Sequence, residues 1–214
     1  MPYRNILAVN SVYHVFTKSI AGYKIFNSEV DYKRIIGTIA FYNQDDPESK
    51  FSVFWDKNND EGKGFDIRGG LAKLIAYCIM PTHIHLVLSP LKEDCVSKFM
   101  NRVLKSYSKY FNVKHNRKGP LWEGRFKSVL VNTDEQLQHL TRYVHLNPVT
   151  SYLVDKPDDW EASSYKEYIG KSKDCICDFK DYMDMNGADY AEFVNERKDY
   201  QRELAGIKHL ILEP

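Results

Sequence analysis

Residues 77–88, with the sequence YCIMPTHIHLVL, form the stretch that decides the fold. The run from Leu71 to Met80 is strongly apolar and predicts a buried strand, and Pro81-Thr82 predicts a turn after it. His83–Ser89 then predicts a second strand, in which apolar residues alternate with the histidines. We therefore expect two strands joined by a tight turn, with His83 and His85 near the start of the second.

The two histidines form a candidate metal site. Residues i and i+2 of a strand point to the same face, so His83 and His85 project together, roughly 6–7 Å apart at the backbone. Ile84, Leu86 and Leu88 point the other way, into the core. Two adjacent charged imidazoles would repel, so we expect both to be neutral and able to bind a metal ion. The alternative is a pair of surface histidines on a half-buried strand.

The remaining sequence predicts further strands of one sheet and the helices that pack on it. A strand is expected at 13–20, a helix from the Ser28 cap to about Tyr42, and a short strand near Phe51–Trp55. A helix at 93–112, a strand at 126–132 and a helix that begins after Thr133 and ends at Pro148 follow. This order predicts an α+β fold, a ferredoxin-like antiparallel sheet with helices on one face, followed from about Asp155 by a mostly helical tail.

The last of these helices carries a candidate nucleophile. In residues 137–147, LQHLTRYVHLN, Tyr143 and Asn147 are four apart and share one flank of the helix. A phenol there could attack a phosphate, and a carboxamide could complete a metal shell. The alternative is that Tyr143 is an aromatic at the edge of the core and Asn147 a helix cap. His139 and His145 fall on other faces of the helix, and we expect them at the surface.

The helix at 93–112 carries a cationic stripe. Lys98, Arg102, Lys105 and Lys109 fall within about 60° of one another around the helix, with apolar residues opposite. A solvated face normally mixes charge signs, so a stripe without acids favours contacts with phosphates. Arg125 and Lys127 extend the patch: residues 98–127 hold nine Lys or Arg against one acid, although the net charge of the whole chain is +1. The alternative is an ordinary solvated face.

The composition indicates a globular protein, with 43% hydrophobic and 28% charged residues among 214. No apolar run approaches the roughly 20 residues of a membrane span, and the N-terminus lacks the layout of a secretory signal. We therefore expect a cytoplasmic protein without a membrane partner.

Taken together, several motifs resemble the single-tyrosine HUH transposases, especially the branch of REP-associated tyrosine transposases. The resemblance covers nearly the whole chain in order and is carried by residues 77–88, GPLWEGRFKSVLV at 119–131, RYVHLNPV at 142–149, WEASSY at 160–165 and KHLILE at 208–213.

The resemblance implies a catalytic domain at residues 1–154 and a helical extension at residues 155–214. It implies cleavage and rejoining of single-stranded DNA, with Tyr143 as the nucleophile and His83 and His85 as ligands of Mg²⁺ or Mn²⁺. Asn147 stands where relatives usually carry a glutamine that completes the metal shell. The implied partner is single-stranded DNA with hairpin structure, bound by a monomer or homodimer. The alternatives are a domesticated protein that binds DNA hairpins without cutting them, and a replication-initiator-like nickase.

Overall fold

The computed structural model describes residues 7–47, 49–58, 70–172 and 176–196. In these ranges no helix combines the length and the apolar character that a membrane crossing requires. The elements in chain order are β1 (Val12–Lys18), η1 (Ile20–Gly22), α1 (Glu29–Tyr42), α2 (Phe51–Asn58), β2 (Ala72–Met80), β3 (His83–Pro90), α3 (Cys95–Lys114), β4 (Lys127–Val131), α4 (Asp134–Thr150), η2 (Pro157–Asp159), α5 (Tyr165–Tyr168) and α6 (Gly187–Asn195).

The four strands form one sheet in the order β2-β3-β1-β4. Each neighbouring pair is antiparallel, with Phe16 opposite His85 and Lys18 opposite His83. This confirms the expected α+β fold class with a ferredoxin-like antiparallel sheet. The hairpin of β2 and β3 supplies the strand that carries both histidines, and β1 lies directly beside that strand.

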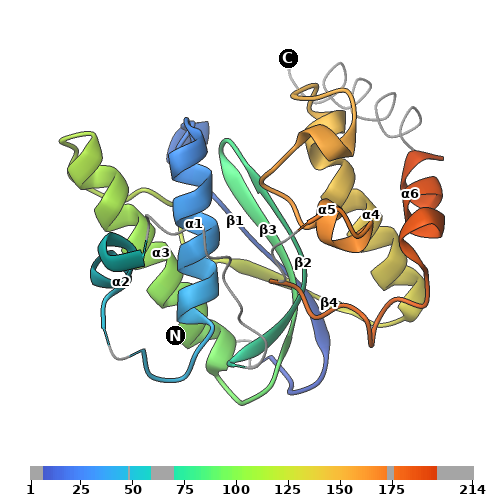
Figure 1. Ribbon diagram of the computed structural model, residues 1–214. Coiled ribbons are helices and arrows are strands. Elements are labelled where there is room, and N and C mark those ends of the chain that lie inside the picture. Colours follow the sequence, from blue (N-terminus) through green and yellow to red (C-terminus); the bar gives the residue numbers. More distant parts are fainter. Residues whose placement is uncertain (1–6, 48, 59–69, 173–175, 197–214) are drawn as a thin grey trace.

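Helices cover both faces of the sheet, which differs from the single covered face that we expected. One core joins α1 and α3 to residues such as Val15, Leu86 and Leu88. A second core joins α4 and the C-terminal helices to residues such as Ile75 and Val87 on the opposite face. Figure 1 shows the sheet between these two layers. The apolar run of β2 explains the second layer, because a strand that is apolar on both faces must be covered on both.

Two predictions about secondary structure are wrong. Phe51–Trp55 belongs to the helix α2 rather than to a strand. Its aromatic residues have high strand propensity, but their spacing also fits one helix face, and Phe51 packs against the side chains of Phe41 and Arg34. Pro148 does not end α4, which continues to Thr150. A proline removes its own N–H from the helix, and the burial of Val149 in the second core favours the extra turn.

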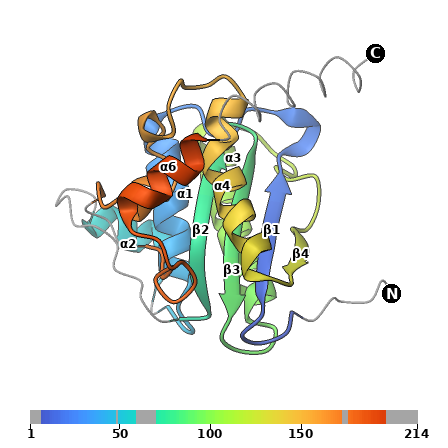
Figure 2. The same ribbon diagram turned by 90° about the vertical axis from the view of Figure 1, so that its right-hand side faces the viewer.

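The region after α4 packs on the same face of the sheet as α4. The side chains of Tyr165, Tyr168 and Tyr190 are buried there, and Ser163 forms a β-bridge with Cys78 at the outer edge of β2. Figure 2 shows α4 and α6 over this face. The predicted division at residue 154 stays a prediction, and residues 208–213 lie outside the described ranges.

His145 is fully buried, so the expectation of a surface residue is wrong, whereas His139 is exposed as expected. The His145 Nδ1 atom lies 2.7 Å from the Tyr190 hydroxyl, and its Nε2 atom lies 2.7 Å from Ser164 Oγ. Ser164 Oγ in turn accepts a hydrogen bond from the Tyr77 backbone N–H at 2.9 Å. This chain of hydrogen bonds attaches α4 to β2. Burial lowers the pKa of His145 to about 3.

Because His145 stays neutral in the folded protein but titrates near pH 6.5 when unfolded, it should make stability fall with acidity. Its contribution is complete above about pH 6.5 and is lost as the pH falls towards about 3. The Gln variant at this position removes the titrating group. Urea unfolding at several pH values should show the difference in unfolding free energy between wild type and His145→Gln shrinking by up to about 1.4 kcal/mol per pH unit below pH 6. A difference that is constant from pH 7 to pH 4.5 would contradict this.

Candidate active site

The histidine pair lies on β3 and faces α4. His85 is 6% exposed, His83 is half-buried, and their ring centroids are 4.9 Å apart with the planes almost perpendicular. Ile84 and Leu86 between and beside them enter the core under α1 and α3. The alternation of the strand therefore places the two imidazoles together on one face, as the sequence pattern predicts.

Hydrogen bonds occupy one nitrogen of each imidazole. Thr82 Oγ1 lies 2.9 Å from His83 Nδ1, and His14 Nε2 lies 2.9 Å from His85 Nδ1. The other nitrogen of His85, Nε2, is buried and has no hydrogen-bond partner among the described residues. A buried polar atom without a partner is costly, and the atom is of the type that binds a divalent metal. The pair therefore fits a metal ion held by the Nε2 atoms of His83 and His85.

Both imidazoles are neutral at pH 7. Burial lowers the pKa of His83 to about 4, with a smaller effect of the Lys18 charge. Burial, the largest cause, acts together with the neighbouring His83, His14 and Lys18 to lower the pKa of His85 to about 2. Metal ligation needs the deprotonated nitrogen, and the lowered pKa values keep both imidazoles in that form at neutral pH.

Two residues of β1 beside the pair were missed by the sequence analysis. His14 bonds to His85, and Lys18 is the direct neighbour of His83 across the strands. Directly opposed residues of an antiparallel pair share a face, so the alternate residues His14, Phe16 and Lys18 all lie on the side of the site. The period-two pattern of β1 could have grouped these three side chains, but their proximity to the histidine pair depends on the register between β1 and β3.

The structure brings Tyr143 from α4 to the histidines of the sheet. Its ring centroid lies 5.9 Å from that of His85 and 6.4 Å from that of His14, edge-on to both. The side chain is 43% exposed, so an outside substrate can reach the phenol. Burial raises the pKa of the phenol, and the nearby Asn147 amide partly offsets this rise. Tyr143 is therefore a protonated phenol near neutral pH.

Asn147 lies one helical turn after Tyr143 and is 7% exposed. Its amide Nδ2 donates to the Tyr143 carbonyl oxygen at 3.0 Å, which leaves Oδ1 as the atom able to ligate. Within the described ranges, no group of three or more His, Cys, Asp and Glu side chains is placed to hold a metal ion. A metal at this site would thus depend on two imidazoles, with further oxygen ligands from Asn147, water or substrate.

The cationic residues predicted to bind DNA lie on two sides of the sheet. Lys98, Lys105 and Lys109 are exposed on α3, which packs on the face opposite to α4. Arg102 is held by the loop after α1, donating to the carbonyl oxygens of Gln44 at 3.1 Å and Asp45 at 2.8 Å. The α3 stripe is therefore remote from Tyr143.

Lys127 and Arg125 lie nearer to the candidate site. Lys127 opens β4 opposite Phe16, which in turn stands opposite His85. Directly opposed residues share a face, so Lys127 lies on the face of the histidine pair, as Lys18 does. Arg125 is exposed just before β4. The structure thus adds Lys18 to the candidate cations and separates Lys127 from the α3 stripe.

Comparison with known proteins connects this site to a family. Residues 69–147, which include β2, β3, α3, β4 and α4 as far as Asn147, match the family model of IS200-like transposases. This segment of the chain is thus similar to IS200-like transposases. A protein of Haemophilus influenzae described as a REP-associated tyrosine transposase is 30% identical over 101 residues, covering 42% of this chain and 57% of that protein. The chain thus spans somewhat more than half the length of this curated relative.

A solved structure shares the fold of this chain. The structure of a REP-associated tyrosine transposase bound to a REP hairpin superposes with a TM-score of 0.52 and 15% identity, over 86% of this chain and 98% of that chain. At this identity the likeness concerns the fold. A protein from Deinococcus radiodurans described as a transposase gives a TM-score of 0.35 at 16% identity, over 65% of this chain and 90% of that chain. This score is too low to indicate a shared fold.

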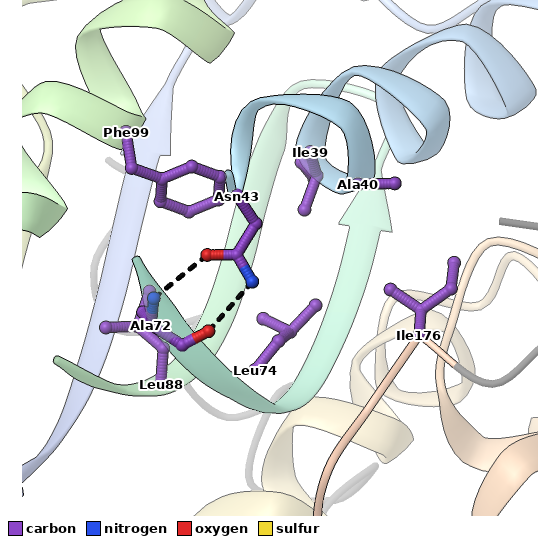
Figure 3. Close-up of a pocket in the computed structure, with 8 residues that line it drawn as sticks. All are labelled: Ile39, Ala40, Asn43, Ala72, Leu74, Leu88, Phe99 and Ile176. Atoms are coloured by element: carbon purple, nitrogen blue, oxygen red, sulfur yellow. Dashed lines mark hydrogen bonds between the residues drawn. The ribbon is translucent and has the colours of Figure 1, made fainter. Parts of the chain in front are cut away.

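An apolar pocket between β2, β3, α1 and α3 is part of the core rather than a second site. Asn43 at the end of α1 accepts a hydrogen bond from the Ala72 N–H at 2.9 Å and donates to the Ala72 carbonyl at 2.8 Å (Figure 3). Leu74, Leu88 and Phe99 line the rest. The pocket lies on the side of α1 and α3, so it does not open towards Tyr143.

The histidine geometry predicts a metal-binding result that does not need DNA. His83→Ala and His85→Ala should each weaken Mn²⁺ binding by at least about tenfold, because each removes one of two imidazole ligands. Titration calorimetry at pH 7 measures this affinity, and His139→Ala, which changes an exposed histidine of α4, is the matched control. Asn147→Ala should have a smaller effect. An unchanged affinity in the double variant His83→Ala/His85→Ala would exclude the site.

Proposed function

We propose that this protein cleaves and rejoins single-stranded DNA, with Tyr143 as the nucleophile and a divalent cation, Mg²⁺ or Mn²⁺, held by His83 and His85. The observation that carries the proposal is the convergence of Tyr143 on the histidine pair, from elements far apart in the sequence. The similarity of residues 69–147 to IS200-like transposases, and the REP hairpin bound to the transposase that shares this fold, support a DNA hairpin as the substrate.

In the proposed reaction, Tyr143 Oη attacks a backbone phosphorus and the bond to the 3′ oxygen of the preceding nucleotide breaks. The phenol proton leaves as the phenol attacks, and the departing oxygen ends as a free 3′-OH, so the products are a 5′-phosphotyrosine and that hydroxyl. When bound, the cation supplies charge neutralisation at the phosphate. The phosphotyrosine conserves the bond energy, so another 3′-OH can attack it and release the tyrosine. This balance favours strand transfer over degradation.

The side chains around Tyr143 explain why the phenol needs a positioned partner. Its pKa is raised by burial, so ionisation must be coupled to the arrival of the phosphate. The neighbouring Asn147 amide partly offsets the effect of burial on this pKa. The edge-on contact with His85 fixes the ring beside the atoms proposed to bind the cation. Proximity and orientation are thus supplied by α4 and its attachment to the sheet.

Tyr143→Phe should abolish the covalent adduct while leaving DNA affinity within about twofold, because it removes one hydroxyl and keeps the ring. Incubation with 5′- and 3′-labelled single-stranded hairpin DNA and Mn²⁺, followed by a denaturing gel, measures the adduct. Tyr152→Phe, which changes an exposed tyrosine just after α4, is the control and should form the adduct as wild type does. A full adduct in Tyr143→Phe would disprove the proposed nucleophile. A wild-type protein that binds the hairpin without any adduct would instead support a domesticated binding protein.

The proposed DNA contacts divide into two sets of cations with different roles. Lys18 and Lys127 share the face of the histidine pair and would contact the reacting strand. Lys98, Lys105 and Lys109 on α3 would contact more distant phosphates. Arg125, exposed just before β4, would act with Lys127. Arg102, which the loop after α1 engages, would contribute less. Backbone contacts position DNA without reading its sequence, so neither set is proposed to give specificity.

Replacing two lysines of each set by alanine should separate the roles of the two sets. Lys105→Ala/Lys109→Ala and Lys18→Ala/Lys127→Ala should each flatten the plot of log K against log salt by about 1.4 units, or about 0.7 per lost phosphate contact. At saturating DNA, cleavage should fall in Lys18→Ala/Lys127→Ala and stay near wild type in Lys105→Ala/Lys109→Ala. Salt titrations with two unrelated oligonucleotides measure the slopes. An unchanged slope in the α3 variant would mean that this stripe faces solvent in the complex.

A further inference from the structure

His14 is a direct polar neighbour of the proposed metal ligand His85, and neither the sequence pattern nor the family match assigns it a role. It lies on β1, outside the matched segment of residues 69–147. Its Nε2 atom is 2.9 Å from His85 Nδ1, and the two ring centroids are 5.1 Å apart. The contact joins the two central strands of the sheet at the site.

The hydrogen bond fixes where the protons of the two imidazoles are. The two facing nitrogens are 2.9 Å apart, so one ring must donate its N–H and the other must accept it. If His85 carried its proton on Nε2, that buried N–H would have no acceptor among the described residues. If His85 carries its proton on Nδ1, it donates to His14 Nε2 and leaves a bare lone pair on its own Nε2.

The second arrangement is the one that metal binding requires. Histidine ligands of metals characteristically donate their second N–H to a neighbouring acceptor, which fixes the tautomer and the ring orientation. Carboxylates and carbonyls usually supply this acceptor, and here an imidazole stands in their place. His14 Nε2 is then engaged with His85 and is not available as a ligand of the same ion.

We propose that His14 is a positioning residue that holds His85 in the Nδ1–H tautomer, so that His85 Nε2 is presented bare to a divalent cation beside Tyr143. The inference rests on the proposed function for the identity of the ligand. The tautomer itself is a property of the metal-free protein and can be tested without that function. His14 contacts neither the cation nor the reacting phosphate in this assignment, so its effect passes through His85.

Two variants of His14 distinguish the hydrogen bond from ring packing. His14→Phe keeps a flat ring and loses the acceptor. His14→Gln places a carbonyl oxygen near the position of Nε2 and restores an acceptor. Phe16→Leu is the matched control, because the Phe16 ring lies 4.9 Å from the His14 ring on the same face of β1 but makes no hydrogen bond to His85.

The first readout is the tautomer of His85 in the metal-free protein at pH 7, from long-range ¹H–¹⁵N correlation spectra of the imidazoles. We expect Nδ1–H in wild type, His14→Gln and Phe16→Leu, and a mixture or the Nε2–H form in His14→Phe. An Nε2–H form in wild type would overturn the proposal, whether or not His14→Phe folds. So would an unchanged Nδ1–H form in a folded His14→Phe variant.

The second readout is Mn²⁺ affinity measured by calorimetry without DNA. His14→Phe should lose about 10- to 100-fold in affinity, as outer partners of metal ligands typically do, while His14→Gln and Phe16→Leu should stay close to wild type. Equal affinity in His14→Phe and wild type would overturn the positioning role. If the wild-type protein bound no Mn²⁺, the metal in the proposed function would fail, and the tautomer spectra would still decide the role of His14.

Discussion

The pleat of β3 is the constraint on which the site depends. Alternate residues of this strand serve two different layers, with Ile84, Leu86 and Leu88 in the core under α1 and α3 and the histidines on the face of α4. A shift of register by one residue would exchange the two sets and bury both imidazoles in the first core. The same apolar residues that fix the strand in the sheet therefore also aim the proposed metal ligands.

The sheet face that carries the histidines is covered by a layer formed by α4 and the C-terminal helices. These helices exclude water and so lower the pKa values of the two imidazoles. This layer also carries the proposed nucleophile, because α4 packs on the sheet through Val144 and Leu146 and leaves Tyr143 partly exposed. Burial lowers the pKa of the imidazoles and raises that of the phenol, so it keeps both kinds of side chain neutral. The proposed cation needs neutral imidazoles, and the proposed reaction ionises the phenol only when a phosphate is bound. Both effects favour a site that becomes reactive when its ligands are assembled.

Periodicity within one element could be read from the sequence, and contacts between elements could not. The shared face of His83 and His85 follows from the two-residue repeat of a strand, and the flank of Tyr143 and Asn147 follows from the helical repeat. The role of His14 depends on strand register, and the burial of His145 depends on Ser164 and Tyr190, which come later in the chain. The error at Phe51 has another cause, since its aromatic neighbours fit a strand and a helix equally well until they pack on Phe41 and Arg34.

The hydrogen bonds of His145 have a consequence for the architecture of the chain. Ser164 bridges the helix of the proposed nucleophile and the outer strand of the sheet, while Tyr190 closes the other side of the imidazole. A polypeptide cut at residue 154 would lose both partners and would uncover a hydrophobic face of α4. The segment that holds Ser164 and Tyr190 therefore fixes the position of α4 on the sheet. Loss of these contacts would change the distance between Tyr143 and His85 without altering either residue.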